Sequence, residues 1–220
     1  MTAPADSRQR ILDSIRAATK TVAKEPAQLA AAYAGLERNY VRQGSLSDQA
    51  RLELMIERLR EYGAEVLESM PAGLPASIAA VLAASGRHIF VAPGGLPAAW
   101  LAAGYNWKTD RGLSNDEMEE TEGVVTAAFC GIADSGTIVL HHSSTEGRRV
   151  LSLLPDWHLC ILRASQVVET LPEYFDRCKQ PPGLATYISG PSATADIEMT
   201  RIKGVHGPRF LHVILVRDEG

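Results

Sequence analysis

The sequence contains few cysteines, and their spacing excludes several kinds of site. Three cysteines occur in the 220 residues, Cys130, Cys160 and Cys178, and no two of them form a Cys-x-x-Cys pair. A structural zinc site or an iron–sulfur cluster held by this chain alone is therefore not expected, because both need clustered thiolate ligands. We expect the thiols to be buried and free in a reducing environment, which makes the cytoplasm the expected location.

The chain also lacks the common nucleotide-binding and hydrolase motifs, and it has no excess of basic residues. The chain has no Gly-x-Gly-x-x-Gly, no Gly-x4-Gly-Lys-Ser/Thr and no Gly-x-Ser-x-Gly. Its 22 Lys and Arg residues stand against 26 Asp and Glu, for a net charge of −4 and a pI near 5.9. This balance argues against a nucleic-acid binder, whose footprint is basic.

No stretch of the sequence is suited to crossing a membrane. The N-terminus lacks the apolar segment of a signal peptide. Between Ser69 and Trp107 the one charged residue is Arg87, but four prolines and five glycines interrupt this stretch. A spanning helix needs about 20 continuous apolar residues, so we expect short buried elements there and no membrane span.

The pattern of apolar residues predicts an α/β fold. Hydrophobic residues make up 45% of the chain and charged residues 22%, which is ordinary for a globular protein. Uncharged, β-branched strands interleaved with helices indicate a mostly parallel sheet with helices on both faces. The expected helices span residues 6–22, 45–62, 75–85, 97–103, 165–178 and 194–202. The expected strands span residues 88–92, 123–130, 136–141, 157–163, 187–188 and 210–216.

The helices near the N-terminus suggest an appendage to this α/β unit. We predict a helical appendage over residues 1–70 and an α/β domain over residues 71–220, the two forming one compact whole. Asp6 or Ser7 is expected to cap the first helix, because short polar side chains accept hydrogen bonds from the free N–H groups of a first turn.

The first candidate site lies between two predicted strands, in the segment Gly131-Ile-Ala-Asp134-Ser135-Gly136-Thr137. Asp134 could act as a base, a nucleophile or a ligand anchor, and Gly136 permits a tight turn or the close approach of a ligand. The alternative is that Asp-Ser-Gly is ordinary hairpin chemistry.

The second candidate is Ser189-Gly190-Pro191-Ser192-Ala-Thr194, which follows a predicted strand and opens a predicted helix. Helix N-termini bind anions through free N–H groups, and the hydroxyls of Ser189, Ser192 and Thr194 add donors. The absence of Lys or Arg in the segment disfavours a phosphate, whereas a carboxylate- or hydroxyl-bearing ligand remains open. A plain helix cap by Ser192 is the alternative.

The third candidate is His206, between two glycines and a proline in Gly204-Val-His206-Gly207-Pro208. Loops on a rigid scaffold concentrate binding residues, and histidine titrates near neutral pH, although a turn histidine without chemistry is the alternative. His141 and His142 are adjacent and would face opposite sides of a strand, so no metal site is expected.

Four segments together resemble one known family. They are GIADSGTIVL (131–140), SLLPDWHLCIL (152–162), ISGPSATADIE (188–198) and KGVHGPRFLHVILV (203–216). In this order they resemble the lactate utilization protein C (LutC) family, whose members carry the LUD domain. The resemblance covers residues 91–216. Where the family usually has Glu-Thr-Gly, this chain has Asp134-Ser135-Gly136, so a carboxylate and a hydroxyl are kept.

The resemblance implies a fold similar to that of the sugar-isomerase and CoA-transferase superfamily. It also implies a non-redox component of a system that oxidises L-lactate to pyruvate, working with two partner proteins that carry the iron–sulfur clusters and binding a small 2-hydroxy or 2-oxo acid. No cofactor is expected on this chain. The alternatives are a stand-alone acyl or CoA transferase, whose nucleophilic turn the Asp134 segment resembles, and a ligand-binding regulatory domain.

We therefore predict one cleft built from the three glycine-containing loops. Asp134 is the candidate catalytic residue. The candidate ligand-binding residues are Ser135, Gly136, Thr137, Ser189, Gly190, Ser192, Thr194 and His206. The cleft is expected beyond the carboxyl ends of the strands, where open α/β sheets bind ligands.

Overall fold

The first forty residues form a unit of their own, separate from residues 41–220. The computed structural model describes residues 4–19, 25–180, 182–194, 202–203 and 207–217. Within the first unit lie helices α1 (Pro4–Thr19) and α2 (Pro26–Ala34). Because α1 begins at Pro4, the predicted cap at Asp6 or Ser7 is wrong. Proline suits the first helical position, where no N–H is needed. The helix therefore starts two residues before the predicted start at residue 6. Val22 lies outside the described residues.

A six-stranded parallel sheet is the centre of the second unit, counted over the described residues. Its order is β1-β12-β7-β4-β2-β3, and every neighbouring pair is parallel. The strands are β1 (Glu65–Ser69), β2 (Ile89–Pro93), β3 (Asn106–Asp110), β4 (Gly123–Ala127), β7 (Trp157–Arg163) and β12 (Phe210–Val216). The predicted mostly parallel α/β fold is confirmed, although the sequence analysis missed the two edge strands β1 and β3.

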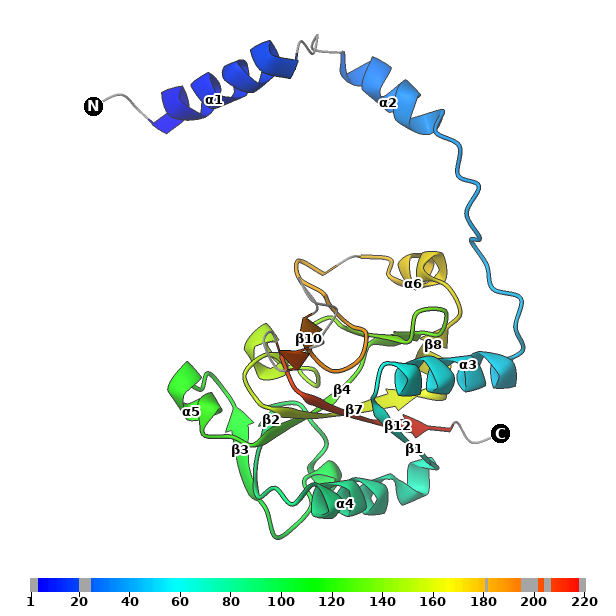
Figure 1. Ribbon diagram of the computed structural model, residues 1–220, viewed down its shortest axis with the longest axis vertical. Helices are drawn as coiled ribbons and strands as arrows, with labels where there is room; N and C mark the ends of the chain where they lie inside the picture. The colour runs from blue at the N-terminus through cyan, green and yellow to red at the C-terminus, as the bar shows by residue number, and fades with distance from the viewer. Residues whose placement is uncertain (1–3, 20–24, 181, 195–201, 204–206, 218–220) are drawn as a thin grey trace. The chain divides into compact units, whose positions relative to one another are not determined.

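Alternation along the central strands directs side chains to opposite faces of this sheet. On β7, Leu159 and Ile161 join one buried cluster, whereas Cys160 and Leu162 join another. Helix α4 (Leu74–Ser85) contributes Leu74, Ile78 and Leu82 to the first cluster, and helix α3 (Asp48–Glu61) packs into the second. Figure 1 shows α3 and α4 on opposite sides of β7 and β12. The sheet is therefore covered by helices on both faces, as predicted.

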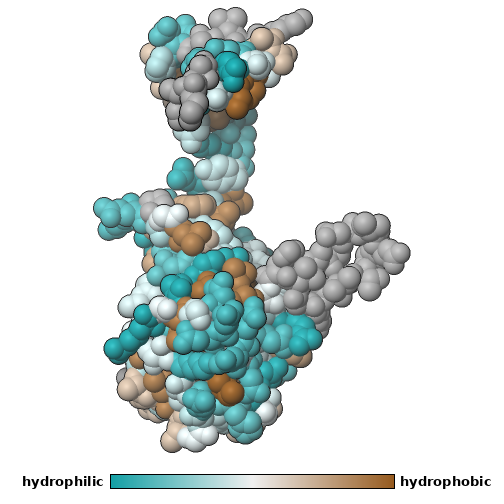
Figure 2. Space-filling model, turned by 90° about the vertical axis from the view of Figure 1, so that its left-hand side faces the viewer, coloured by the Kyte–Doolittle hydropathy of each residue, from teal (hydrophilic) through white to brown (hydrophobic). Residues whose placement is uncertain are grey.

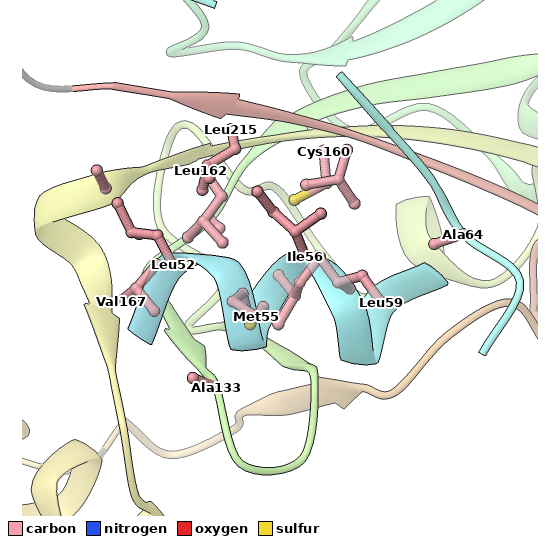
Figure 3. Packing of buried hydrophobic residues seen from close by; sticks show 14 of the residues in the cluster. Leu52, Met55, Ile56, Leu59, Ala64, Ala133, Cys160, Leu162, Val167 and Leu215 are labelled. Carbon is pink, nitrogen blue, oxygen red and sulfur yellow. The ribbon is translucent and has the colours of Figure 1, made fainter. Parts of the chain in front are cut away.

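Helix α3 is the main helical contributor to the core on its face. The Ser47 side chain caps it by accepting a hydrogen bond from the N–H of Ala50 at 3.2 Å. Its inward side chains are Leu52, Met55, Ile56 and Leu59, at the 3.6-residue spacing that the sequence predicts. Figure 3 shows Ile56 directed toward Cys160 and Leu52 beside Val167. This helix lies within the unit of residues 41–220, whereas the sequence analysis counted it in the N-terminal appendage.

A second sheet of four strands packs against α3 and the same face of the main sheet, again counted over the described residues. Its order is β8-β5-β6-β9, with β5 and β6 forming a hairpin. The strands are β5 (Cys130–Ile132), β6 (Thr137–Leu140), β8 (Val167–Val168) and β9 (Thr186–Ile188). Ile138 and Leu140 on β6 point into the core beside α3, so the hairpin turn between β5 and β6 lies close to that helix.

Several predicted elements differ from the structure. The segment predicted as one helix over 165–178 consists of a 3-10 turn η4 (Ala164–Gln166), strand β8 and a short helix α6 (Leu171–Arg177). Pairing with Gly131 and Ile132 holds Val167 and Val168 extended, which suits their β-branched side chains. The predicted strand 123–130 ends at Ala127, where the chain leaves the main sheet for the second one.

The predicted helix 194–202 is wrong at both of its ends. Strand β10 (Ala193–Thr194) pairs antiparallel with β11 (Ile202–Lys203), and residues 195–201 between them lie outside the described residues. A pairing across the segment requires extended backbone at its ends, which a helix cannot supply. The predicted helix 97–103 is a 3-10 turn, η2 (Ala98–Trp100).

The remaining short elements connect the strands. They are η1 (Pro71–Gly73), α5 (Asn115–Glu119) and η3 (Arg149–Ser152). On the face shown in Figure 2, hydrophilic residues predominate and apolar ones form small separate patches. No helix in the described ranges combines the length and the apolar composition that crossing a bilayer requires.

Candidate functional sites

The turn between β5 and β6 packs directly against helix α3. Gly136 has a φ of +57°, and a Cβ added there would lie 2.6 Å from the Cβ of Arg58. Real Cβ atoms do not approach that closely, and a positive φ favours glycine. The close packing on α3 therefore explains this glycine without any ligand.

A chain of hydroxyl groups connects the first two candidate segments. The oxygens of Ser135 and Thr137 are 2.8 Å apart, and the oxygens of Thr137 and Ser189 are also 2.8 Å apart. These three residues and Asp134 line a cavity of about 370 Å³, to which Tyr187 also contributes. The structure thus brings together Asp134, Ser135, Thr137 and Ser189.

The carboxyl group of Asp134 lies in a negatively charged neighbourhood. Burial raises its pKa, and the carboxylates of Glu169 and Glu173 raise it further, against the opposing effect of Arg58. A carboxyl group beside two others holds its proton more strongly, because a third negative charge is repelled. Asp134 itself is exposed in the turn.

The two glutamates are held by the segment that leads into α3. The N–H of Gly44 donates to Glu173 Oε1 at 2.9 Å, and the N–H groups of Ser45 and Leu46 donate to Glu169 at 3.1 and 2.8 Å. A Cβ on Gly44 would lie 2.4 Å from the Cβ of Glu169, so this close approach favours glycine. These carboxylates are therefore structural anchors for residues 44–46.

The second candidate segment also packs on the end of α3 and meets the third. Gly190 has a φ of +83°, and a Cβ there would lie 2.5 Å from the Cβ of Tyr62. Two residues on, the N–H of Ser192 donates to the carbonyl of Pro208 at 2.8 Å. The Ser189–Ser192 loop therefore meets the segment that follows His206, although His206 itself lies outside the described residues.

Between these two loops and the main sheet lies another cavity, of about 260 Å³. Its polar side chains come from η3, β7, β9 and the Ser189–Ser192 loop, and Leu211 of β12 forms part of its apolar wall. The lining residues are Arg149, Ser152, His158, Thr186, Tyr187, Ile188, Ser189, Gly190, Pro191, Ser192, Gly207, Pro208 and Leu211. Since His158 and Leu211 are the second residues of their strands, the cavity lies at the amino ends of β7 and β12 rather than at the expected carboxyl ends.

His158 is the most deeply buried polar group of this cavity. It is 1% exposed, and burial lowers its pKa to about 4. The ring is therefore neutral at pH 7. Its Nε2 lies 2.8 Å from the hydroxyl of Thr126 on β4, and its Nδ1 has no side-chain hydrogen bond among the described residues.

The predicted residues divide between the two cavities. Asp134, Ser135 and Thr137 line the larger one, whereas Gly190 and Ser192 line the smaller one; Ser189 lines both. The backbone of Thr194 lies in β10.

The sequence analysis missed several polar residues of the smaller cavity, namely Arg149, Ser152, His158 and Thr186. A histidine in the otherwise apolar strand WHLCIL was the available signal for His158. No group of three or more His, Cys, Asp or Glu residues in the described ranges is arranged to hold a metal ion.

Comparison with known proteins identifies the family. A model of the LUD domain matches residues 15–216. The chain belongs to the LUD domain family. This confirms the resemblance drawn from the four sequence segments.

Relatives of this LUD domain chain carry a common name. Lactate utilization protein C of Deinococcus radiodurans is 41% identical over 167 residues, which are 73% of this chain and 76% of the relative. Lactate utilization protein C of Bacillus subtilis is 38% identical over 122 residues, 52% of this chain and 50% of the relative. The match thus spans about half the length of the Bacillus protein.

A solved structure supports the fold. The crystal structure of a DUF162 family protein from Deinococcus radiodurans superposes with a TM-score of 0.66 at 34% sequence identity. The superposition covers 78% of this LUD domain chain and 99% of that chain.

Proposed function

We propose that this protein is a non-redox component of an L-lactate oxidation system in the cytoplasm. In this system it works with two partner proteins that carry the iron–sulfur clusters and binds a small 2-hydroxy or 2-oxo acid. The observation that carries the proposal is the 41% identity with the Deinococcus lactate utilization protein C over 73% of the chain.

The state of the cysteines supports a non-redox role. All three are buried and free. Burial raises the pKa of Cys130 to about 11 and that of Cys160 to about 12. Thiols with such pKa values stay protonated at pH 7, whereas cluster ligation and redox chemistry need the thiolate. This state of the thiols supports the assignment of electron transfer to the partners, and free thiols suit the reducing cytoplasm.

Reconstitution tests the proposal. Lactate-dependent reduction of an artificial electron acceptor would be measured for this chain alone, for the two iron–sulfur partners together, and for all three. We expect turnover only, or far faster, with all three, and no iron in this chain purified alone. Equal rates with and without this chain would refute the assignment as a component.

A cysteine variant serves as the matched control. Changing Cys130, Cys160 and Cys178 together to serine should leave lactate oxidation by the reconstituted system within about twofold, at matched folding. Iron that co-purifies with the wild-type chain and is lost in the triple variant would contradict the non-redox role directly.

A further inference from the structure

The smaller cavity has a single cationic side chain among the described residues that line it. Arg149 lies in η3, where its guanidinium donates to the Ser152 hydroxyl at 3.3 Å. It forms no ion pair with any described carboxylate, in contrast to the neighbouring Arg148, which binds Asp110 at 2.7 and 2.9 Å. No Asp or Glu is among the described lining residues. An arginine in such surroundings presents paired donors that match a carboxylate.

The buried His158 supplies a neutral partner in the same cavity. Because its pKa is lowered to about 4, it carries no charge with which to bind a second carboxylate. Its Nε2 is engaged by Thr126, which leaves Nδ1 for a hydroxyl or carbonyl oxygen of a ligand. In the tautomer that carries its proton on Nδ1, the His158 ring donates to such a ligand oxygen while its Nε2 accepts from the Thr126 hydroxyl.

The direction of the hydrogen bond from the Thr186 hydroxyl is set by His142. His142 Nδ1 lies 2.8 Å from the carbonyl oxygen of Gly147, which only accepts, so Nδ1 carries the proton. In the singly protonated ring, Nε2 then accepts from the Thr186 hydroxyl at 2.8 Å. The lone pairs of the Thr186 oxygen are then free to accept a hydrogen bond from a donor on a ligand.

The backbone conformation of His142 is strained. His142 has a φ of +58°, the one positive value outside glycine among the described residues. Such backbone strain is commonly found at functional sites. It places the ring between Gly147 and Thr186, and Thr186 is 5% exposed in the cavity wall.

We infer that this cavity is the binding site for a small 2-hydroxy carboxylate, whose carboxylate pairs with Arg149 and whose hydroxyl accepts a hydrogen bond from His158 Nδ1 and donates one to Thr186. The inference rests on the proposed function and deepens it: of the 2-hydroxy and 2-oxo acids, the site favours the hydroxy acid, because a keto oxygen cannot donate to Thr186.

The ligand side of the inference is tested with four small molecules that share a methyl group. Line broadening of the methyl proton signal by the full chain would be measured for L-lactate, pyruvate, propionate and lactamide. Propionate lacks the C2 oxygen, pyruvate lacks the hydroxyl proton, and lactamide lacks the carboxylate. We expect pyruvate and propionate to bind at least threefold more weakly than lactate, and lactamide at least tenfold more weakly, from typical net hydrogen-bond strengths.

The protein side is tested with three variants at matched unfolding midpoints. Arg149→Met should weaken lactate binding at least tenfold. Thr186→Val, which keeps the shape of the side chain, should reduce the preference for lactate over propionate. The control Arg111→Met removes the same charge outside the cavity and should leave binding within twofold.

The outcomes separate this inference from the proposed function. Lactate binding that is lost in Arg149→Met and kept in Arg111→Met supports the site, whether or not the reconstituted system oxidises lactate. Pyruvate or propionate binding as tightly as lactate overturns the role of the hydroxyl. Absent binding, or equal binding by wild type and Arg149→Met, overturns the site even when the reconstituted system is active.

Discussion

Replacing Gly190 by alanine tests how firmly the loop beside the smaller cavity is held against helix α3. The residue has a φ of +83°, and an alanine Cβ would lie 2.5 Å from the Tyr62 Cβ. That contact cannot be relieved by rotating a side chain, because both atoms are attached directly to the backbone. Either the loop or the end of α3 must shift.

Gly63 offers a matched control one residue beyond Tyr62. Its φ is +86°, and a Cβ there would meet nothing within 4 Å. Gly63→Ala therefore carries the positive-φ cost alone, about 1–2 kcal/mol. Gly190→Ala carries the same cost plus that of overpacking, about 1–3 kcal/mol. The difference between the two variants isolates the contact with Tyr62.

The assay is urea unfolding followed by far-UV circular dichroism, with the unfolding free energy compared at equal m-value. We expect Gly190→Ala to lose about 2–5 kcal/mol and Gly63→Ala about 1–2 kcal/mol. If Gly190→Ala loses no more stability than Gly63→Ala, the loop is not packed on α3, and the shape of the cavity beside it would have to be reconsidered.

Three further predictions concern other parts of the same unit. Asp134→Asn should fold normally and raise the urea midpoint, because it removes repulsion from Glu169 and Glu173; a loss of about a thousandfold in reconstituted lactate oxidation would instead indicate direct chemistry at Asp134. Wild-type stability should fall by on the order of 3 kcal/mol between pH 6.5 and 4, because the unfolded chain protonates His158 where the folded one, with a pKa of about 4, does not. His158→Gln should lose less over that range, and equal losses would argue against the buried neutral ring. Met55→Ala should cost about 2–5 kcal/mol in the same urea assay, since Met55 is fully buried on the inward face of α3; a loss under 1 kcal/mol would contradict the tight packing there.

The elements predicted best from the sequence are those whose residues follow one simple period. Strands β7 and β12 have the predicted bounds, 157–163 and 210–216, because uninterrupted apolar runs in a parallel sheet are covered on both faces. Helix α4 ends where expected, at Gly86 with a φ of +65°. In each case the local pattern and the tertiary environment favour the same structure.

The second sheet was hidden because its strands are short and paired at a distance. Val167 and Val168 sit in a segment with helical spacing, and their pairing with Gly131 and Ile132 overrides that local preference. Strand β1 is exposed at the sheet edge, with three of its five residues charged or polar, so it lacks the apolar run that marks a buried strand. The local sequence of neither segment indicates the strand with which it pairs.

The candidate site shows the same limit more sharply. The glycine-rich segments were chosen because turns and helix ends carry recognisable residues, and two of those glycines, Gly136 and Gly190, are required by helix α3 rather than by a ligand. The polar groups of the smaller cavity lie instead on η3, β7 and β9, where Arg149, His158 and Thr186 form no motif along the chain. They are brought together only because the second sheet folds over the first. The informative feature in the sequence was therefore a polar residue where an apolar one is expected. His158 lies in a strand that is otherwise apolar up to Arg163. A polar side chain is tolerated in the core only with partners that the fold supplies.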